Sequence, residues 1–122
     1  MDKKLHDEGL EVRREIMDRE RIDNAMKNAT DFDKIFQEMV NEYCWGAIWT
    51  RPGLSRKTRS LINIAMLSAL NRPNEVKLHI EGAINNGCTD EEIKEVLLQV
   101  MIYCGVPAAL DSVKIAKSIL SL

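Results

Sequence analysis

The sequence predicts an all-α protein of about six or seven helices. Apolar residues recur at spacings of three and four along most of the 122 residues, no stretch alternates like a β-strand, and helix-start and helix-stop residues separate the apolar segments. Apolar residues make up 45% of the chain, which is enough for a core. A chain of this length suits one domain, so we expect a single domain over residues 1–122.

The first three expected helices occupy the amino-terminal third. Residues 5–17 and 18–28 place apolar side chains among charges, in the manner of amphipathic helices. Asp31 is a suitable cap for the next helix. Six large side chains then follow at helical spacing and predict a buried stripe: Phe32, Ile35, Phe36, Met39, Val40 and Tyr43. Residues 51–53, with the sequence Arg-Pro-Gly, predict a loop after it.

The fourth expected helix begins after Ser55, continues to about Asn71, and is apolar on nearly every side over residues 61–70. Such a helix must be covered all round, within the domain or between subunits. Because a small domain has little means of covering it alone, we expect a homo-oligomer. The alternative is that neighbouring helices of the same chain suffice.

The remaining helices are bounded by strong local signals. Pro73 suits the first turn of a helix that stops before Gly87. Thr89 and Glu92 form a capping box at the start of the next helix. A last helix is expected over residues 108–120.

Charge and composition exclude several classes of function. The net charge is −2 and basic residues cluster only locally, so nucleic acid is not an expected partner. No apolar run reaches the length of a membrane span and the amino terminus is too charged for a signal peptide, so we expect no membrane partner and a cytoplasmic location. The three cysteines form no C-x-x-C, and no cluster of ligands predicts a metal site.

Glu75 and His79 are the candidate acid/base pair. They lie four residues apart and therefore share one helical face, where a carboxylate and an imidazole could exchange a proton near neutral pH. The alternative is a core histidine or an exposed ion pair. His6, the second histidine of the chain, lies near a terminus that we expect to be mobile.

Arginines are the candidate binders of a carboxylate, because guanidinium forms paired hydrogen bonds with that group. The candidates are Arg51, Arg56, Arg59 and Arg72. Arg51 is the strongest of them, since it lies in a loop close to Trp49. Surface ion pairs are the alternative for each.

Aromatic residues could line an apolar pocket beside these groups. Trp45 and Trp49 lie four residues apart near the predicted loop, and Tyr103 lies where an apolar helix ends. The tyrosine hydroxyl could donate a hydrogen bond to a substrate oxygen. For all three, packing in the core or at an interface is the alternative.

Several long motifs carry a family resemblance: residues 43–54 (YCWGAIWTRPGL), 58–61 (TRSL), 69–72 (ALNR), 95–100 (EVLLQV) and 103–109 (YCGVPAA). They resemble the carboxymuconolactone decarboxylase family, which includes alkylhydroperoxidase D. Residues 9–14 and 29–32 look like its decarboxylase subgroup. The resemblance implies an alkylhydroperoxidase D-like helical bundle that assembles into trimers or hexamers.

The thiol branch of that family carries a C-x-x-C-x-x-x-H motif for peroxide reduction. Here His79 matches the histidine, while Arg72 and Glu75 occupy the two cysteine positions. The redox dithiol is therefore absent, which disfavours peroxidase chemistry of that kind.

The resemblance implies instead a carboxy-lyase that needs no cofactor. Its reaction would convert 4-carboxymuconolactone, a small anionic lactone, to the 3-oxoadipate enol-lactone in protocatechuate catabolism. In this hypothesis Arg51, with Arg59, anchors the carboxylate that stays, and His79, set by Glu75, delivers a proton to carbon. The aromatic residues would lower the polarity of the pocket, which favours the loss of a carboxylate as neutral CO2.

Two alternatives remain open at this point. One is an alkylhydroperoxidase D-like enzyme acting on another substrate, including an antioxidant enzyme with thiol and peroxide redox chemistry. Its thiols would be Cys44, Cys88 and Cys104. The other is a non-catalytic oligomer whose pocket binds an anion.

Overall fold

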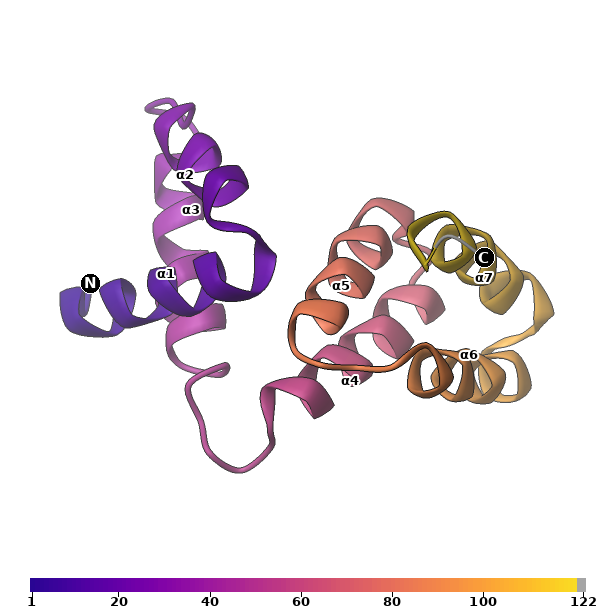
Figure 1. The fold of residues 1–122 in the computed structure, drawn as a ribbon. Coiled ribbons are helices and arrows are strands. Elements are labelled where there is room, and N and C mark those ends of the chain that lie inside the picture. The colour runs from indigo at the N-terminus through magenta and orange to yellow at the C-terminus, as the bar shows by residue number, and fades with distance from the viewer. Residues whose placement is uncertain (121–122) are drawn as a thin grey trace. The chain divides into compact units, whose positions relative to one another are not determined.

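The computed structural model describes residues 1–120, which form seven α-helices and one π-helix and contain no strand (Figure 1). The prediction of an all-α protein is therefore confirmed. Packing divides the chain into two compact units, Met1–Leu54 and a second unit that begins at Ser55. The single domain expected from the chain length stays a prediction. Within residues 1–120, no helix combines the length and the hydropathy that a membrane span requires.

The first unit contains four helical segments: α1 (Lys3–Met17), α2 (Arg19–Lys27), α3 (Lys34–Met39) and the π-helix η1 (Val40–Gly46). The first two match the segments expected from sequence to within two residues. Asp2 caps α1, since its carboxylate accepts a hydrogen bond from the amide of Leu5 at 3.0 Å.

Helix α1 crosses η1 so closely that their backbones touch. A Cβ atom built on Gly9 would lie 1.9 Å from the carbonyl oxygen of Asn41 and 2.4 Å from the amide nitrogen of Gly46. A Cβ atom built on Gly46 would lie 2.5 Å from the carbonyl oxygen of Leu5. Only glycine therefore fits at these two positions, one on each side of the crossing.

The π-helix is defined by hydrogen bonds that span five residues. The amide of Ala47 donates to the carbonyl of Glu42 at 2.8 Å, and the amide of Trp49 donates to the carbonyl of Cys44 at 3.1 Å. Such segments are rare and often lie at functional sites. Apolar spacing alone did not predict this one.

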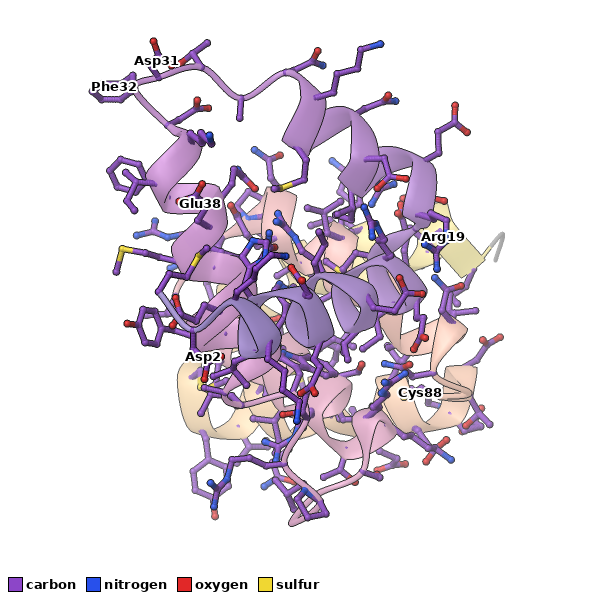
Figure 2. All side chains as sticks on the ribbon, turned by 90° about the vertical axis from the view of Figure 1, so that its left-hand side faces the viewer. Asp2, Arg19, Asp31, Phe32, Glu38 and Cys88 are labelled. Atoms are coloured by element: carbon purple, nitrogen blue, oxygen red, sulfur yellow. The ribbon has the colours of Figure 1, made fainter. Side chains whose placement is uncertain are left out.

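Two expectations for the third helix are wrong. The residue that precedes α3 is Asp33 rather than Asp31, and Phe32 lies in the turn before the helix, 84% exposed (Figure 2). The residues of the predicted buried stripe are exposed in this unit, with exposed fractions between 37% and 84%: Phe32, Ile35, Phe36, Met39, Val40 and Tyr43. Spacing identifies one apolar face but not its cover, and the residues that pack under α1 come instead from η1, Asn41 and Trp45 among them.

The second unit packs four helices around a core: α4 (Arg56–Ala69), α5 (Pro73–Asn85), α6 (Asp90–Cys104) and α7 (Val106–Leu120) (Figure 1). The predicted caps are confirmed, with Ser55 at the start of α4 and the Thr89–Glu92 capping box at the start of α6. Gly87 ends the turn after α5 at a φ of 86°. The last helix begins at Val106, two residues before the expected start.

The core of this unit lies between α4, α5, α6 and α7. Ile64 and Ile80 are fully buried at its centre, with Val76 and Ile93 1% exposed beside them. The neighbouring helices of the unit do not cover α4 all round, because Ile62 and Met66, and Leu70 at its carboxyl-terminal end, are 40% to 62% exposed, and cover between subunits stays a prediction. One side of α4 faces the core and the other carries exposed apolar side chains.

Candidate active site

His79 lies on α5 at the edge of the apolar core of the second unit. Pro73 starts this helix, so that Glu75 falls in the first turn and His79 one turn later. Glu75 is exposed, whereas His79 is half-buried next to the fully buried Val76 and Ile80. Glu75 and His79 lie four residues apart on α5, so they share one helical face, as their spacing predicted.

The side chain of Asn63, on α4, faces His79. The amide nitrogen Nδ2 of Asn63 lies 3.4 Å from Nδ1 of the imidazole. Burial lowers the pKa of His79 below its ordinary value, and the nearby carboxylate of Glu75 opposes that effect in part. The imidazole is therefore biased towards its neutral form at neutral pH.

Further polar groups lie between the same two helices. The amide of Asn86 donates to the hydroxyl of Ser60 at 2.8 Å. Arg59 is half-buried and lies four residues before Asn63, so the two share a face of α4. Arg72 immediately precedes α5 as its amino-terminal cap residue and is exposed. A polar strip from α4 and α5 thus borders the apolar core.

Tyr103, on α6, lies against a different part of α4. With α6, that helix forms an open, mostly apolar hollow of about 330 Å³, lined by residues that include Thr58, Ile62, Tyr103 and Cys104. Its lining does not include His79 or Asn63. Within the second unit the structure therefore brings Tyr103 to a hollow and His79 to a polar strip, and it does not bring these two candidates together.

Three predicted site residues belong to the first unit. Trp45 and Trp49 stack with ring centroids 4.8 Å apart, and each is only 4% exposed. Arg51 is exposed in the turn that follows η1. The structure brings the two tryptophans together as expected from their spacing, and their role in a substrate pocket stays a prediction.

Sequence reasoning missed Asn63, although the sequence contains a signal for it. Asn63 interrupts the apolar run from Leu61 to Leu70, as does Ser68. A polar side chain in such a run needs a partner on a neighbouring helix, because an unpaired buried polar group is costly. Asn63 faces His79, and Ser68 shares a hydrogen bond of 2.7 Å with Ser112 of α7.

The second histidine is also held in place, contrary to the expected mobility of His6. Its Nε2 lies 3.2 Å from Nδ2 of Asn41, and its Nδ1 lies 3.0 Å from the carboxylate of Asp7. Asn41 is fully buried and accepts a hydrogen bond of 2.9 Å from the guanidinium of Arg13. The amino-terminal helix is thus tied to η1 through side chains.

Thiol chemistry finds little support at two of the three cysteines. Burial raises the pKa of Cys88, which lowers the fraction of reactive thiolate at neutral pH. The Cys44 residue is exposed, yet the surrounding protein atoms still raise its pKa by desolvation, and the positive charge of Arg13 opposes that effect in part. Among residues 1–120, no three side chains of the metal-binding types come together as a ligand set.

Comparison with known proteins gives one matching family model. It describes the carboxymuconolactone decarboxylase family and matches residues 35–118. The nitrosuccinic acid decarboxylase of Metarhizium robertsii is 42% identical over 110 residues, which cover 90% of this chain and 77% of that protein. The 4-carboxymuconolactone decarboxylase of Acinetobacter baylyi is 38% identical over 118 residues, which cover 97% of this chain and 88% of that protein.

Proposed function

Because the chain belongs to the carboxymuconolactone decarboxylase family, we propose that it is a carboxy-lyase that removes CO2 from a small dicarboxylate without a cofactor. The first substrate to test is 4-carboxymuconolactone, with the 3-oxoadipate enol-lactone as product. The relative named for this lactone supports it, since that relative aligns with 97% of the chain.

Nitrosuccinic acid is the second substrate to test, because the other relative is named for it. The two acids share one chemical feature. When the bond to the departing carboxylate breaks, its electron pair is delocalised onto oxygen, of the lactone carbonyl in one acid and of the nitro group in the other. A second carboxylate stays behind in both. The proposed substrate class is therefore a dicarboxylate with an electron-accepting group that is bonded to the carbon that loses CO2 or is conjugated with it through a double bond.

The observation that carries this proposal is the placement of His79 beside Asn63 at the edge of an apolar core. Charge that develops on a substrate oxygen there is stabilised more strongly than in water, because hydrogen bonds are worth more at low polarity. Low polarity also favours the loss of a carboxylate as neutral CO2. We assign His79 to contact with the developing charge and Glu75 to setting its environment.

The carboxylate that stays needs a cation. Arg59 is the best placed of the arginines in the second unit, because it is half-buried and shares a helical face with Asn63. Arg72, which immediately precedes α5, is the second candidate. Arg51 keeps the anchoring role that the sequence assigns to it, and an Arg51→Lys variant tests that role by its effect on KM.

We further propose that the protein is a homo-oligomer, a trimer or a hexamer. Exposed apolar side chains on α4 and at its carboxyl-terminal end support this, since a monomer seldom leaves such a row uncovered: Ile62, Met66 and Leu70. Light scattering after gel filtration should give three or six times the mass of one chain. A mass equal to one chain at micromolar concentration would contradict the assembly while leaving the reaction open.

The reaction is tested by ultraviolet turnover of each acid, with CO2 release followed in parallel. We expect turnover of the lactone, and a loss of about 100-fold or more in kcat for His79→Gln. Lys77→Gln is the matched control, because Lys77 lies on the same helix, is exposed and sits two residues from His79. A folded wild-type protein that releases CO2 from neither acid would refute the proposed reaction, and inactivation by a thiol-blocking reagent would favour the redox alternative.

A further inference from the structure

In the contact between Asn63 and His79, Asn63 is the hydrogen-bond donor and His79 is the acceptor. The atom of Asn63 that lies 3.4 Å from Nδ1 is the amide nitrogen, which carries hydrogens and can only donate. Nδ1 must therefore offer its lone pair. A neutral imidazole has one ring proton, so that proton resides on Nε2.

The same contact disfavours the charged form of the ring. An imidazolium carries a hydrogen on both nitrogens, so its Nδ1–H would point at the N–H of Asn63. The half-buried position of His79 adds to this, since burial disfavours a charge. Glu75 is the group on the same face of α5 that acts in the opposite direction.

His6 provides the opposite case in the same chain. Arg13 can only donate, and it points at Oδ1 of Asn41, so the amide nitrogen of Asn41 is the atom that faces Nε2 of His6. The other ring nitrogen, Nδ1, faces the carboxylate of Asp7. A neutral His6 therefore carries its proton on Nδ1, which donates to the carboxylate, while Nε2 accepts from Asn41. At Nδ1, His79 faces the N–H donor of Asn63, whereas His6 faces the carboxylate acceptor of Asp7.

We propose that Asn63 is a positioning residue that holds His79 neutral with its proton on Nε2, so that His79 stabilises the developing oxyanion by donating a hydrogen bond. This inference rests on the proposed decarboxylase function and changes the role that the sequence alone assigns to His79. The carbon–carbon bond to the departing carboxylate breaks, CO2 leaves, and the electron pair delocalises onto the substrate oxygen that Nε2–H faces. A water molecule then gives its proton to carbon, and the hydroxide that remains combines with CO2 as bicarbonate.

The first test is the tautomer of each histidine in the resting protein. Long-range ¹H–¹⁵N correlation NMR of uniformly labelled protein separates a protonated from an unprotonated ring nitrogen, and the chain has only two histidines, which a His79→Gln spectrum assigns. We expect the Nε2–H tautomer for His79 and the Nδ1–H tautomer for neutral His6. A His79 protonated on Nδ1, or doubly protonated at neutral pH, would overturn the inference and return proton delivery to His79.

The second test exchanges the donor for an acceptor. Asn63→Asp should move the ring proton of His79 to Nδ1 and raise its pKa by about one to three units, because the new charge favours imidazolium. Asn86→Ala is the matched control: it removes an amide hydrogen bond of 2.8 Å between Ser60 of α4 and the residue that follows α5, but not the contact to His79. An unchanged tautomer in Asn63→Asp, or an equal change in Asn86→Ala, would show that packing, and not the Asn63 amide, determines which ring nitrogen of His79 carries the proton.

Turnover separates the two proposals. If the wild-type protein releases CO2 and carries Nε2–H, Asn63→Asp should reduce kcat and shift the pH profile, while Asn86→Ala should keep the wild-type profile. If the wild-type protein carries Nε2–H but releases CO2 from neither acid, the decarboxylase proposal falls and the tautomer assignment stands. If it releases CO2 with the proton on Nδ1, the reaction stands and the assignment falls.

Discussion

Replacing Gly9 by alanine should loosen the crossing of α1 and η1. The new Cβ atom would lie 1.9 Å from the carbonyl oxygen of Asn41, whereas ordinary contact begins at about 3.4 Å. The three nearest atoms all belong to the backbone of Asn41 or Gly46, so no side chain can rotate away. Helix α1 would have to retreat by roughly 1.5 Å, a gap that removes much of the dispersion energy of the atoms on either side.

The expected cost is the balance of two effects. Overpacking of this kind costs up to about 3 kcal/mol, because the backbone itself must move. Alanine returns about 1 kcal/mol, since it favours a helix more than glycine does. The net loss should be about 2 kcal/mol in the free energy of unfolding of the first unit, which corresponds to a fall of roughly 1 M in the urea midpoint at a typical slope.

The assay is tryptophan fluorescence during urea unfolding. Both tryptophans of the chain, Trp45 and Trp49, are buried in the first unit, so their emission reports on that unit. Gly53→Ala is the control, because a Cβ atom there meets nothing within 4 Å and the midpoint should stay where it is. Superimposable unfolding curves for Gly9→Ala and the wild type would show that the two backbones do not touch.

Three further predictions concern the second unit, with far-UV circular dichroism in urea as the measurement. Ser68→Ala should cost about 1 to 3 kcal/mol because it strands the buried hydroxyl of Ser112, and the double alanine variant should cost less than the two single changes together; strict additivity would argue against the hydrogen bond. Thr89→Ala should cost about 1 kcal/mol through loss of the capping box on α6, so an unchanged midpoint would contradict that cap. Because the folded pKa of His79 is lowered, the unfolded chain binds the proton more readily, and stability that is complete above the ordinary pKa should decline as the pH falls below about 6.5. His79→Gln should flatten that decline, and an equal slope in variant and wild type would refute it.

Local signals account for the parts of the fold that the sequence predicted well. Pro73 at the start of α5, Gly87 after it and the capping box at Thr89 each act within a few residues. Their effect therefore does not depend on the rest of the molecule. These local signals predicted the order of α4, α5 and α6 along the chain and the residues near which they begin or end.

The parts that failed depend on contacts between distant residues. The π-helix η1 exists where Gly9 and Gly46 let two backbones meet, and no spacing within residues 40–46 indicates that partner. Spacing identifies the apolar face of a helix and not what covers it, so the sequence predicts burial for the stripe that begins at Phe32, whereas the structure exposes it. Phe32 itself lies outside α3, which begins at Lys34.

One part of the candidate site was predicted by local spacing, and the other part depends on contacts between distant residues. The common face of Glu75 and His79 follows from their spacing alone, and the structure places both on α5, with Arg72 just before its first residue. The partner of His79 is 16 residues away on α4, and only the packing of two helices brings Asn63 to it. The sequence marked Asn63 as a polar residue in an apolar run but could not say which group it meets.

The direction of the Asn63 contact matters because the two candidate acids make the same demand of the protein. Their anions differ in shape, but in both the negative charge gathers on oxygen before a proton reaches carbon. A neutral N–H held at one point can stabilise either charge, whereas proton delivery to carbon would require a different geometry for each acid. We therefore expect His79→Gln to reduce kcat by a similar factor for every acid that the wild-type protein decarboxylates, as a comparison of kcat ratios would measure. A large loss on one acid with near-normal turnover of another would show that His79 acts on the carbon of a particular substrate and not on a charge common to the class.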